Sequence, residues 1–143
     1  MIRIVRAAVQ YWAVVFAFAF AVGVVRTLWL APWVGETPAV LMELPLVLGA
    51  SWLAARTLTS RHGITTRRQA LAMGAIAFAL LLLAEALLAR ALAGQTLRAW
   101  FAALWVVPGI YGLAGQVGFA VMPGGVTILD TSRRCLQWAC HRD

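Results

Sequence analysis

The stretch ALAMGAIAFALLLLAEALLARALA, residues 70–93, decides the class of this protein. Only Glu85 and Arg90 interrupt its run of apolar side chains, and it contains no proline. A helix needs roughly 20 mostly apolar residues to cross the hydrocarbon core of a bilayer. The stretch therefore predicts a membrane-spanning helix over residues 69–93.

Three further apolar segments of similar length flank this one and predict spans over residues 7–30, 37–55 and 99–122. The connections between the segments are short, which is typical of adjacent antiparallel helices. We therefore expect an all-α integral membrane protein, with residues 1–123 forming an antiparallel four-helix bundle. The remaining residues, 124–143, have weak periodicity and predict a cytoplasmic tail that is either a short interfacial helix or disordered.

The composition supports a lipid environment. Hydrophobic residues make up 63% of the chain and charged residues only 12%, with a mean hydropathy of +0.85, whereas a soluble domain is about half apolar and a quarter charged. A net charge of +7 in a soluble protein would suggest nucleic-acid binding. Here the basic residues are all arginine and lie mainly between the apolar segments. We therefore expect them to orient the protein in the bilayer and to contact lipid headgroups, with no nucleic-acid partner.

The distribution of arginine predicts that orientation. Cytoplasmic loops of membrane proteins carry an excess of basic residues. Most arginines of this chain lie before the first span, between the second and third spans, or after the fourth: Arg3, Arg6, Arg56, Arg61, Arg67, Arg68, Arg133, Arg134 and Arg142. Both termini and the second connection are therefore predicted to lie in the cytoplasm.

Ionisable residues of the first three spans are expected to gather in the outer half of the membrane. With a rise of about 1.5 Å per residue, Arg26 lies about 6 Å, Glu43 about 9 Å and Glu85 about 12 Å below the outer boundary. Arg90 lies just above them. Because charges inside a bilayer are costly and usually find partners, we predict a contact between Arg26 and Glu43, with Glu85 in the same layer. This polar cluster either fixes the helix register or forms a proton or cation site, and the sequence leaves both interpretations open.

Prolines and uncharged polar residues also stand out within the spans. Pro45 and Pro108 remove helical hydrogen-bond donors and predict kinks in the second and fourth spans. Gln116 and Ser51 are expected at similar depths near the cytoplasmic face, where a hydrogen bond between them would form an inner polar clamp. The glycines of residues 109–118 predict close helix packing. Aromatic residues at the span ends predict interfacial belts made of Trp29, Trp33 and Trp100 outside and of Tyr11 and Trp12 inside.

The common signatures of catalysis and cofactor binding are absent from the sequence. His62 and His141 lie outside the predicted spans, so no intramembrane histidine is available to bind haem. The segment CLQWACH, residues 135–141, departs from the CxxCH pattern of covalent haem attachment. No phosphate loop, metalloprotease motif or serine-hydrolase motif is present. We therefore expect no enzyme activity, no cofactor and no metal site.

The chain resembles an uncharacterised family of small four-span inner-membrane proteins of proteobacteria in three segments: GVVRTLWLAPWVGETPAVLMELPLVLGASWLAAR, MGAIAFALLLLAEALLARALAG and GIYGLAGQVGFAVMP. The resemblance covers roughly residues 20–123. Its most specific part is the string that contains Arg26, Pro32, Gly35, Glu43 and Pro45. It implies a four-span architecture and a location in the bacterial inner membrane, but no activity.

Two functions remain open from the sequence. The first is a non-catalytic accessory or assembly subunit whose helices pack in a homo-oligomer or in a larger membrane complex. The alternative is a small proton- or cation-coupled transporter or channel component that uses the outer polar cluster. Small multidrug transporters also have four spans and a membrane glutamate, but theirs lies in the first span, where this chain has Arg26 and no acid.

Overall fold

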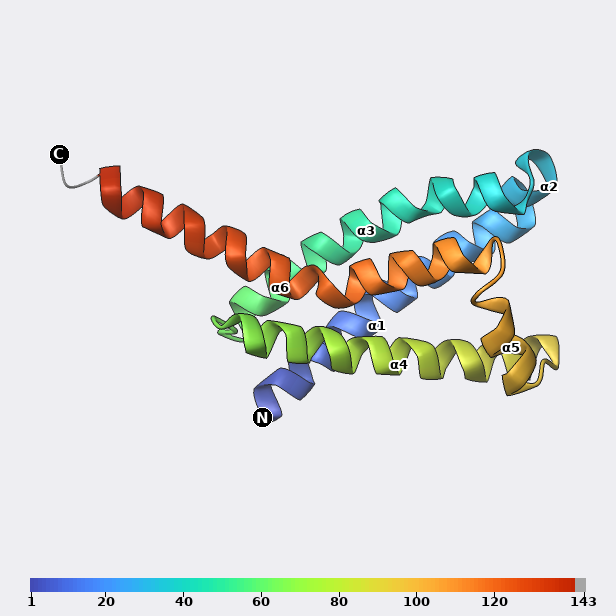
Figure 1. Ribbon diagram of the computed structural model, residues 1–143, viewed down its shortest axis with the longest axis horizontal. Coiled ribbons are helices and arrows are strands. Elements are labelled where there is room, and N and C mark those ends of the chain that lie inside the picture. The colour runs from blue at the N-terminus through green and yellow to red at the C-terminus, as the bar shows by residue number, and fades with distance from the viewer. Residues whose placement is uncertain (141–143) are drawn as a thin grey trace.

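The computed structural model describes the backbone of residues 1–140 and the side chains of residues 1–128. All regular secondary structure in this part of the chain is helical, as the sequence predicts. Four long helices form the body of the protein. In chain order the elements are α1 (Ile2–Val25), the π-helical turn η1 (Arg26–Leu30), α2 (Ala31–Val34), α3 (Glu36–Arg61), α4 (Arg67–Ala93), α5 (Leu97–Ala103) and α6 (Gly109–Cys140) (Figure 1).

The long helices pack so that α1 and α6 each contact both α3 and α4. Figure 1 shows α3 and α4 on opposite sides, with α1 and α6 between them. The expected adjacency of consecutive spans therefore holds for α1 with α3 and is wrong for α3 with α4. An extended chain covers about 3.3 Å per residue, so the connection over residues 62–66 is long enough to reach the diagonally opposite helix.

The ends of the helices gather at two ends of the molecule. The N-terminus and the connection between α3 and α4 lie at one end in Figure 1, and α2 and α5 lie at the other. The C-terminal part of α6 leaves the other helices and projects beyond the first of these ends. This arrangement agrees with the grouping of arginine-rich segments expected from the sequence.

Three helical stretches are long and apolar enough to cross a membrane: Ile2–Val34, Glu36–Arg61 and Arg67–Ala93. They contain the first three predicted spans. The first stretch continues through the π-helical turn, where the Thr27 hydroxyl donates to the Gly23 carbonyl oxygen at 2.8 Å. Gly35, with φ of 89°, ends this stretch, because a left-handed backbone conformation at that point reverses the chain into α3.

The predicted fourth span over residues 99–122 is wrong in its boundaries. Helix α5 ends at Ala103, and α6 begins at Gly109, after the cis peptide bond between Val107 and Pro108. Pro108 is therefore not a kink within a span. It lies in the break between two helices, where a residue that cannot donate and that disfavours helix before it is well suited. A Cβ atom at Gly109 would collide with the Ala103 carbonyl, so this tight reversal requires glycine.

At its other end α6 continues through Pro123 to Cys140. The predicted boundary between the bundle and a separate tail at residue 123 therefore does not coincide with a helix end. The helix continues because the donor that Pro123 lacks is replaced: the Tyr11 hydroxyl donates to the Phe119 carbonyl oxygen at 2.9 Å. The side chains of the predicted tail beyond residue 128, with its cysteines, arginines and His141, lie outside the described residues.

Small residues let the helices approach closely, as the glycine-rich sequence predicts. A Cβ atom at Gly74 of α4 would collide with the backbone carbonyl oxygen of Ala120 of α6. On another side of α6, Gly115 and Gly118 leave room for leucine side chains of α3. The close packing of α6 on α3 and α4 therefore depends on glycine at these positions, where a larger residue would crowd the neighbouring helix.

The aromatic residues divide between the surface and the core. Trp29 and Trp33 are 73% and 88% exposed at the end of the first helical stretch, which fits an interfacial position. Tyr11 is 0% exposed, and its ring stacks on that of Phe119 with the centroids 4.5 Å apart. The expectation that Tyr11 belongs to an interfacial belt is therefore wrong, since its ring faces α6 in the core.

Candidate intramembrane binding cavity

A cavity of about 220 Å³ lies between α1, α3, α4 and α6. It collects polar side chains from the π-helical turn η1 and from α3, α4 and α6. Its polar lining is formed by Arg26, Glu43, Glu85 and Gln116, and its apolar lining by Val15, Phe16, Ala19, Val40, Leu44, Val47, Leu48, Leu81, Gly112, Gly115 and Phe119. The cavity is therefore mainly apolar, with a small group of ionisable residues.

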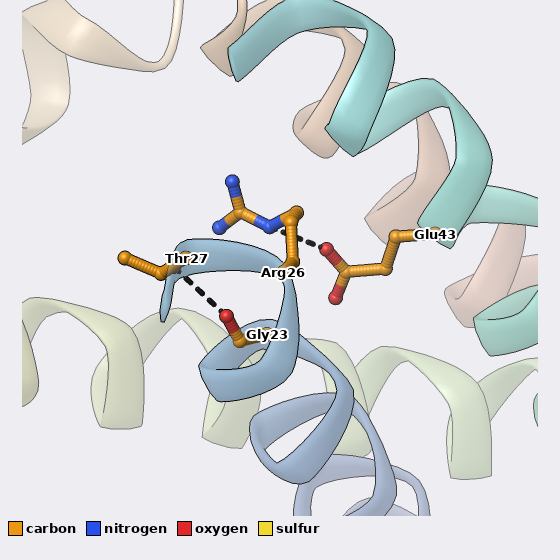
Figure 2. Close-up of polar contacts among 4 residues, drawn as sticks. All are labelled: Gly23, Arg26, Thr27 and Glu43. Carbon is orange, nitrogen blue, oxygen red and sulfur yellow. Dashed lines mark hydrogen bonds and ion pairs between the residues drawn. The ribbon is translucent and has the colours of Figure 1, made fainter. Parts of the chain in front are cut away.

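The ion pair between Arg26 and Glu43 forms one part of this polar group. The Arg26 Nε atom lies 2.7 Å from the Glu43 Oε2 atom, and Figure 2 shows the terminal guanidinium nitrogens pointing away from the carboxylate. The side chains remain 27% and 17% exposed, respectively. This is the contact between the first two spans that the sequence predicts.

Local structure places both members of the pair. Arg26 is the first residue of the π-helical turn, and a π-helical turn changes the face on which the following side chains lie. Glu43 lies in the first half of α3, and a Cβ atom at Gly23 would be 3.7 Å from its Oε1 atom. An alanine at position 23 would make ordinary van der Waals contact with the carboxylate, and the Thr27 hydroxyl donates to the Gly23 carbonyl oxygen (Figure 2).

Glu85 and Gln116 form the second part of the polar group. The Gln116 Nε2 atom lies 2.7 Å from each of the two Glu85 carboxylate oxygens, to which it donates. The Gln116 Oε1 atom is buried and has no hydrogen-bond partner. This contact ties α4 to α6 and leaves one buried acceptor unsatisfied.

The predicted clamp between Ser51 and Gln116 is wrong. The Ser51 hydroxyl donates to the Val47 carbonyl oxygen in its own helix at 2.7 Å. Gln116 lies about two turns after the start of α6 at Gly109, whereas a helix starting at residue 99 would have carried it to the cytoplasmic half. The break at Pro108 therefore moves Gln116 into the layer of Glu85.

The outer polar cluster expected from the sequence is present in part. Arg26, Glu43 and Glu85 line one cavity, as predicted from their depths. Arg90 is exposed and does not line the cavity, because five helical residues rotate it well away from the face of Glu85. Pro45 is also exposed, and α3 continues through it. The predicted layer of Gln116 is wrong, because the helix that carries this residue begins at Gly109 rather than at residue 99.

The lining contains two carboxyl groups and only one basic group. Arg26 contributes one positive charge, which Glu43 compensates directly at 2.7 Å. Glu85 has an amide rather than a cation as its partner. Among the side chains of residues 1–128, the pair of Arg26 with Glu43 is the only ion pair, and no group of three or more His, Cys, Asp or Glu residues could hold a metal ion. The cavity therefore presents one carboxyl group without a positive partner.

Comparison of the chain with known protein families, curated proteins and solved structures finds no match. The resemblance to small four-span proteobacterial proteins stays a prediction from the sequence. The functional argument therefore depends on the geometry of the cavity.

Proposed function

We propose that this chain is a small, non-catalytic inner-membrane protein that binds a cation or a proton in its intramembrane cavity, as a component of a transport system. Glu85 is the binding group, with Gln116 orienting its carboxylate. The pair of Arg26 and Glu43 neutralises itself and holds the first two spans in register. The cavity with one uncompensated carboxyl group is the observation that carries this proposal. Ionisable groups inside a membrane commonly mark ion or proton pathways.

The proposal includes four membrane spans, with α6 as the fourth and both termini in the cytoplasm. Two observations support it. Helix α6 packs on α3 and α4 as α1 does, so it shares the layer of the three apolar stretches. The arginine-rich N-terminus and the connection between α3 and α4 lie at one end of the molecule. With that end in the cytoplasm, the cavity's polar group lies in the outer half of the membrane of a bacterial cell.

Reconstitution in liposomes tests the proposed function. Vesicles that contain the full chain and a pH-sensitive dye receive a step in external pH, or a gradient of sodium or potassium, with the membrane potential clamped. We expect faster dissipation of at least one gradient than in empty vesicles. Glu85→Gln should return the rate to that of empty vesicles, whereas Glu36→Gln, which changes an exposed acid in the first turn of α3, should not. Equal rates for wild-type and empty vesicles would overturn the transport proposal.

A second candidate function is an accessory or assembly subunit of a homo-oligomer or of a larger membrane complex. The projection of the C-terminal part of α6 beyond the other helices favours it, because an isolated helix end is suited to contact a partner (Figure 1). Purification from native membranes in mild detergent distinguishes the candidates. A stoichiometric partner together with an absence of flux would support the accessory function.

A further inference from the structure

We propose that the ligand of the cavity is a small organic ammonium ion with N–H donors and an apolar body. This inference rests on the proposed cation-binding function and names its chemical class. It uses three features of the cavity: its carboxyl group without a positive partner, its hydrogen-bonding groups and its apolar wall.

The charge of the lining selects a cation. The positive charge of Arg26 is matched at 2.7 Å by Glu43, whereas Glu85 is held only by the Gln116 amide. A carboxylate in an apolar environment is costly without a positive partner, and either a proton or a bound cation removes that cost. A bound cation would supply that partner, whereas a bound anion would add a second uncompensated negative charge to the same cavity.

The hydrogen-bonding groups select a cation with more than one N–H. Each carboxylate oxygen of Glu85 accepts one contact from Gln116 and can accept another. The Gln116 Oε1 atom is buried without a partner. An ammonium group has several donors and can therefore serve both a carboxylate and the amide oxygen beside it. A quaternary ammonium ion would leave the amide oxygen unsatisfied.

The remaining wall selects an apolar body over a metal ion. Most of the lining is aliphatic or aromatic, with Phe16 from α1 and Phe119 from α6. Hard metal ions such as calcium take six to eight oxygen ligands, which this lining does not provide. The volume of about 220 Å³ is below the range of drug-sized pockets, so the body is small. A single ring or a short alkyl chain on an amine fits this description.

Equilibrium dialysis of labelled phenethylammonium against the purified full chain in detergent tests the inference. Neutral 2-phenylethanol, which has the same ring and chain, and sodium chloride serve as competitors. We expect saturable binding of phenethylammonium that neither competitor displaces, since the first lacks the charge and the second lacks the ring. Competition by 2-phenylethanol at equal concentration, or the absence of saturable binding, would overturn the proposal.

Three variants locate the binding site. Glu85→Gln should weaken phenethylammonium binding by about tenfold or more, because the charged acceptor is lost, and Glu36→Gln should leave it unchanged. Ala19→Leu narrows the cavity without altering charge and should also weaken binding. Circular dichroism and gel filtration verify that each variant is folded. Binding that is equally strong in Glu85→Gln and wild type would refute the assignment.

The flux assay and the binding assay together distinguish failure of this inference from failure of the proposed function. If Glu85-dependent flux of protons or metal cations occurs without phenethylammonium binding, the ligand class is wrong and the cation-binding function stands. If phenethylammonium binds through Glu85 without any flux, the ligand class stands and the transport proposal is wrong. If neither occurs, both are wrong.

Discussion

The hydroxyl of Tyr11 donates to the Phe119 carbonyl oxygen at 2.9 Å, and this is the carbonyl that Pro123 leaves without a helical donor. Phe119 lies four residues before the proline, at the position whose partner would be the missing N–H. The two rings also stack, with an interplanar angle of 4°. A side chain of the first helix therefore completes the backbone of the last one across the bundle, and α6 passes through Pro123 without ending.

Replacement of Tyr11 by phenylalanine should show how much the Tyr11 hydroxyl contributes to the free energy of unfolding. The variant keeps the ring stack and removes the only donor identified for the Phe119 carbonyl oxygen, together with the contact between the Tyr11 hydroxyl and Ser51. We therefore expect a loss of about 0.5–2 kcal/mol in the free energy of unfolding. Tyr111→Phe, at a 36% exposed tyrosine of the same helix as Phe119, is the matched control and should change stability little. Unfolding in mixed detergent, followed by circular dichroism, measures both. Equal stabilities of the two variants would contradict this account.

The sequence predicts the contact of Arg26 with Glu43 correctly and the contact of Ser51 with Gln116 wrongly, because the two predictions depend on helix boundaries at different distances. Arg26 and Glu43 lie within a few turns of Gly35, where the chain reverses, so their depths follow from the helical rise alone. Glu85 is similarly close to the end of α4 at Ala93. Errors in helix boundaries are small over such short distances, and the contact of Arg26 with Glu43 is accordingly present.

The helix boundaries of the fourth apolar segment do not follow from its sequence in the same way. Its hydropathy is continuous from residue 99 to residue 122, so hydropathy alone reveals neither the break at Pro108 nor the continuation through Pro123. Gly109 meets the Ala103 backbone at the break, and Tyr11 supplies the donor at the continuation. The dipeptide Pro108-Gly109 is a turn signal, but it does not show whether the helix breaks or only kinks there, and the Tyr11 contact has no signal in the local sequence. The predicted positions of Gln116 and Tyr11 are therefore wrong, whereas the predicted all-helical secondary structure is confirmed for the described residues.

Gly74→Ala should destabilise the packing of α4 on α6. The added methyl group would collide with the Ala120 carbonyl oxygen, which belongs to the backbone and cannot rotate away. Overpacking of this kind costs about 1–3 kcal/mol. Gly49→Ala, at a helical glycine with nothing within 4 Å of the added atom, is the control and should raise the free energy of unfolding by up to about 1 kcal/mol, because alanine favours a helix over glycine. A variant at position 74 that is as stable as this control would show that the helices separate easily.

Glu43→Gln should destabilise the protein by leaving the Arg26 charge without its partner. Breaking a fully buried ion pair costs about 3–5 kcal/mol. These side chains remain 27% and 17% exposed, so we expect a smaller loss of about 1–2 kcal/mol. Glu36→Gln should cost about 0.5 kcal/mol or less, because its charge is exposed at a helix start. Combining Glu43→Gln with Arg26→Gln should restore most of the lost stability, and a further loss in the double variant would argue against the pair.

A double-mutant cycle between Glu85 and Gln116 should show coupling, whereas a cycle between Ser51 and Gln116 should not. Gln116 donates to both carboxylate oxygens of Glu85, while Ser51 donates within its own helix. The variants Glu85→Ala, Ser51→Ala and Gln116→Ala, with the two pairs, provide both cycles. We expect a coupling free energy of about 0.5–2 kcal/mol for the first cycle and a value near zero for the second. Coupling between Ser51 and Gln116 instead would place Gln116 deeper in the membrane and would remove it from the cavity. It would then be unavailable to orient the Glu85 carboxylate, on which both the proposed cation binding and the selection of an ammonium ion depend.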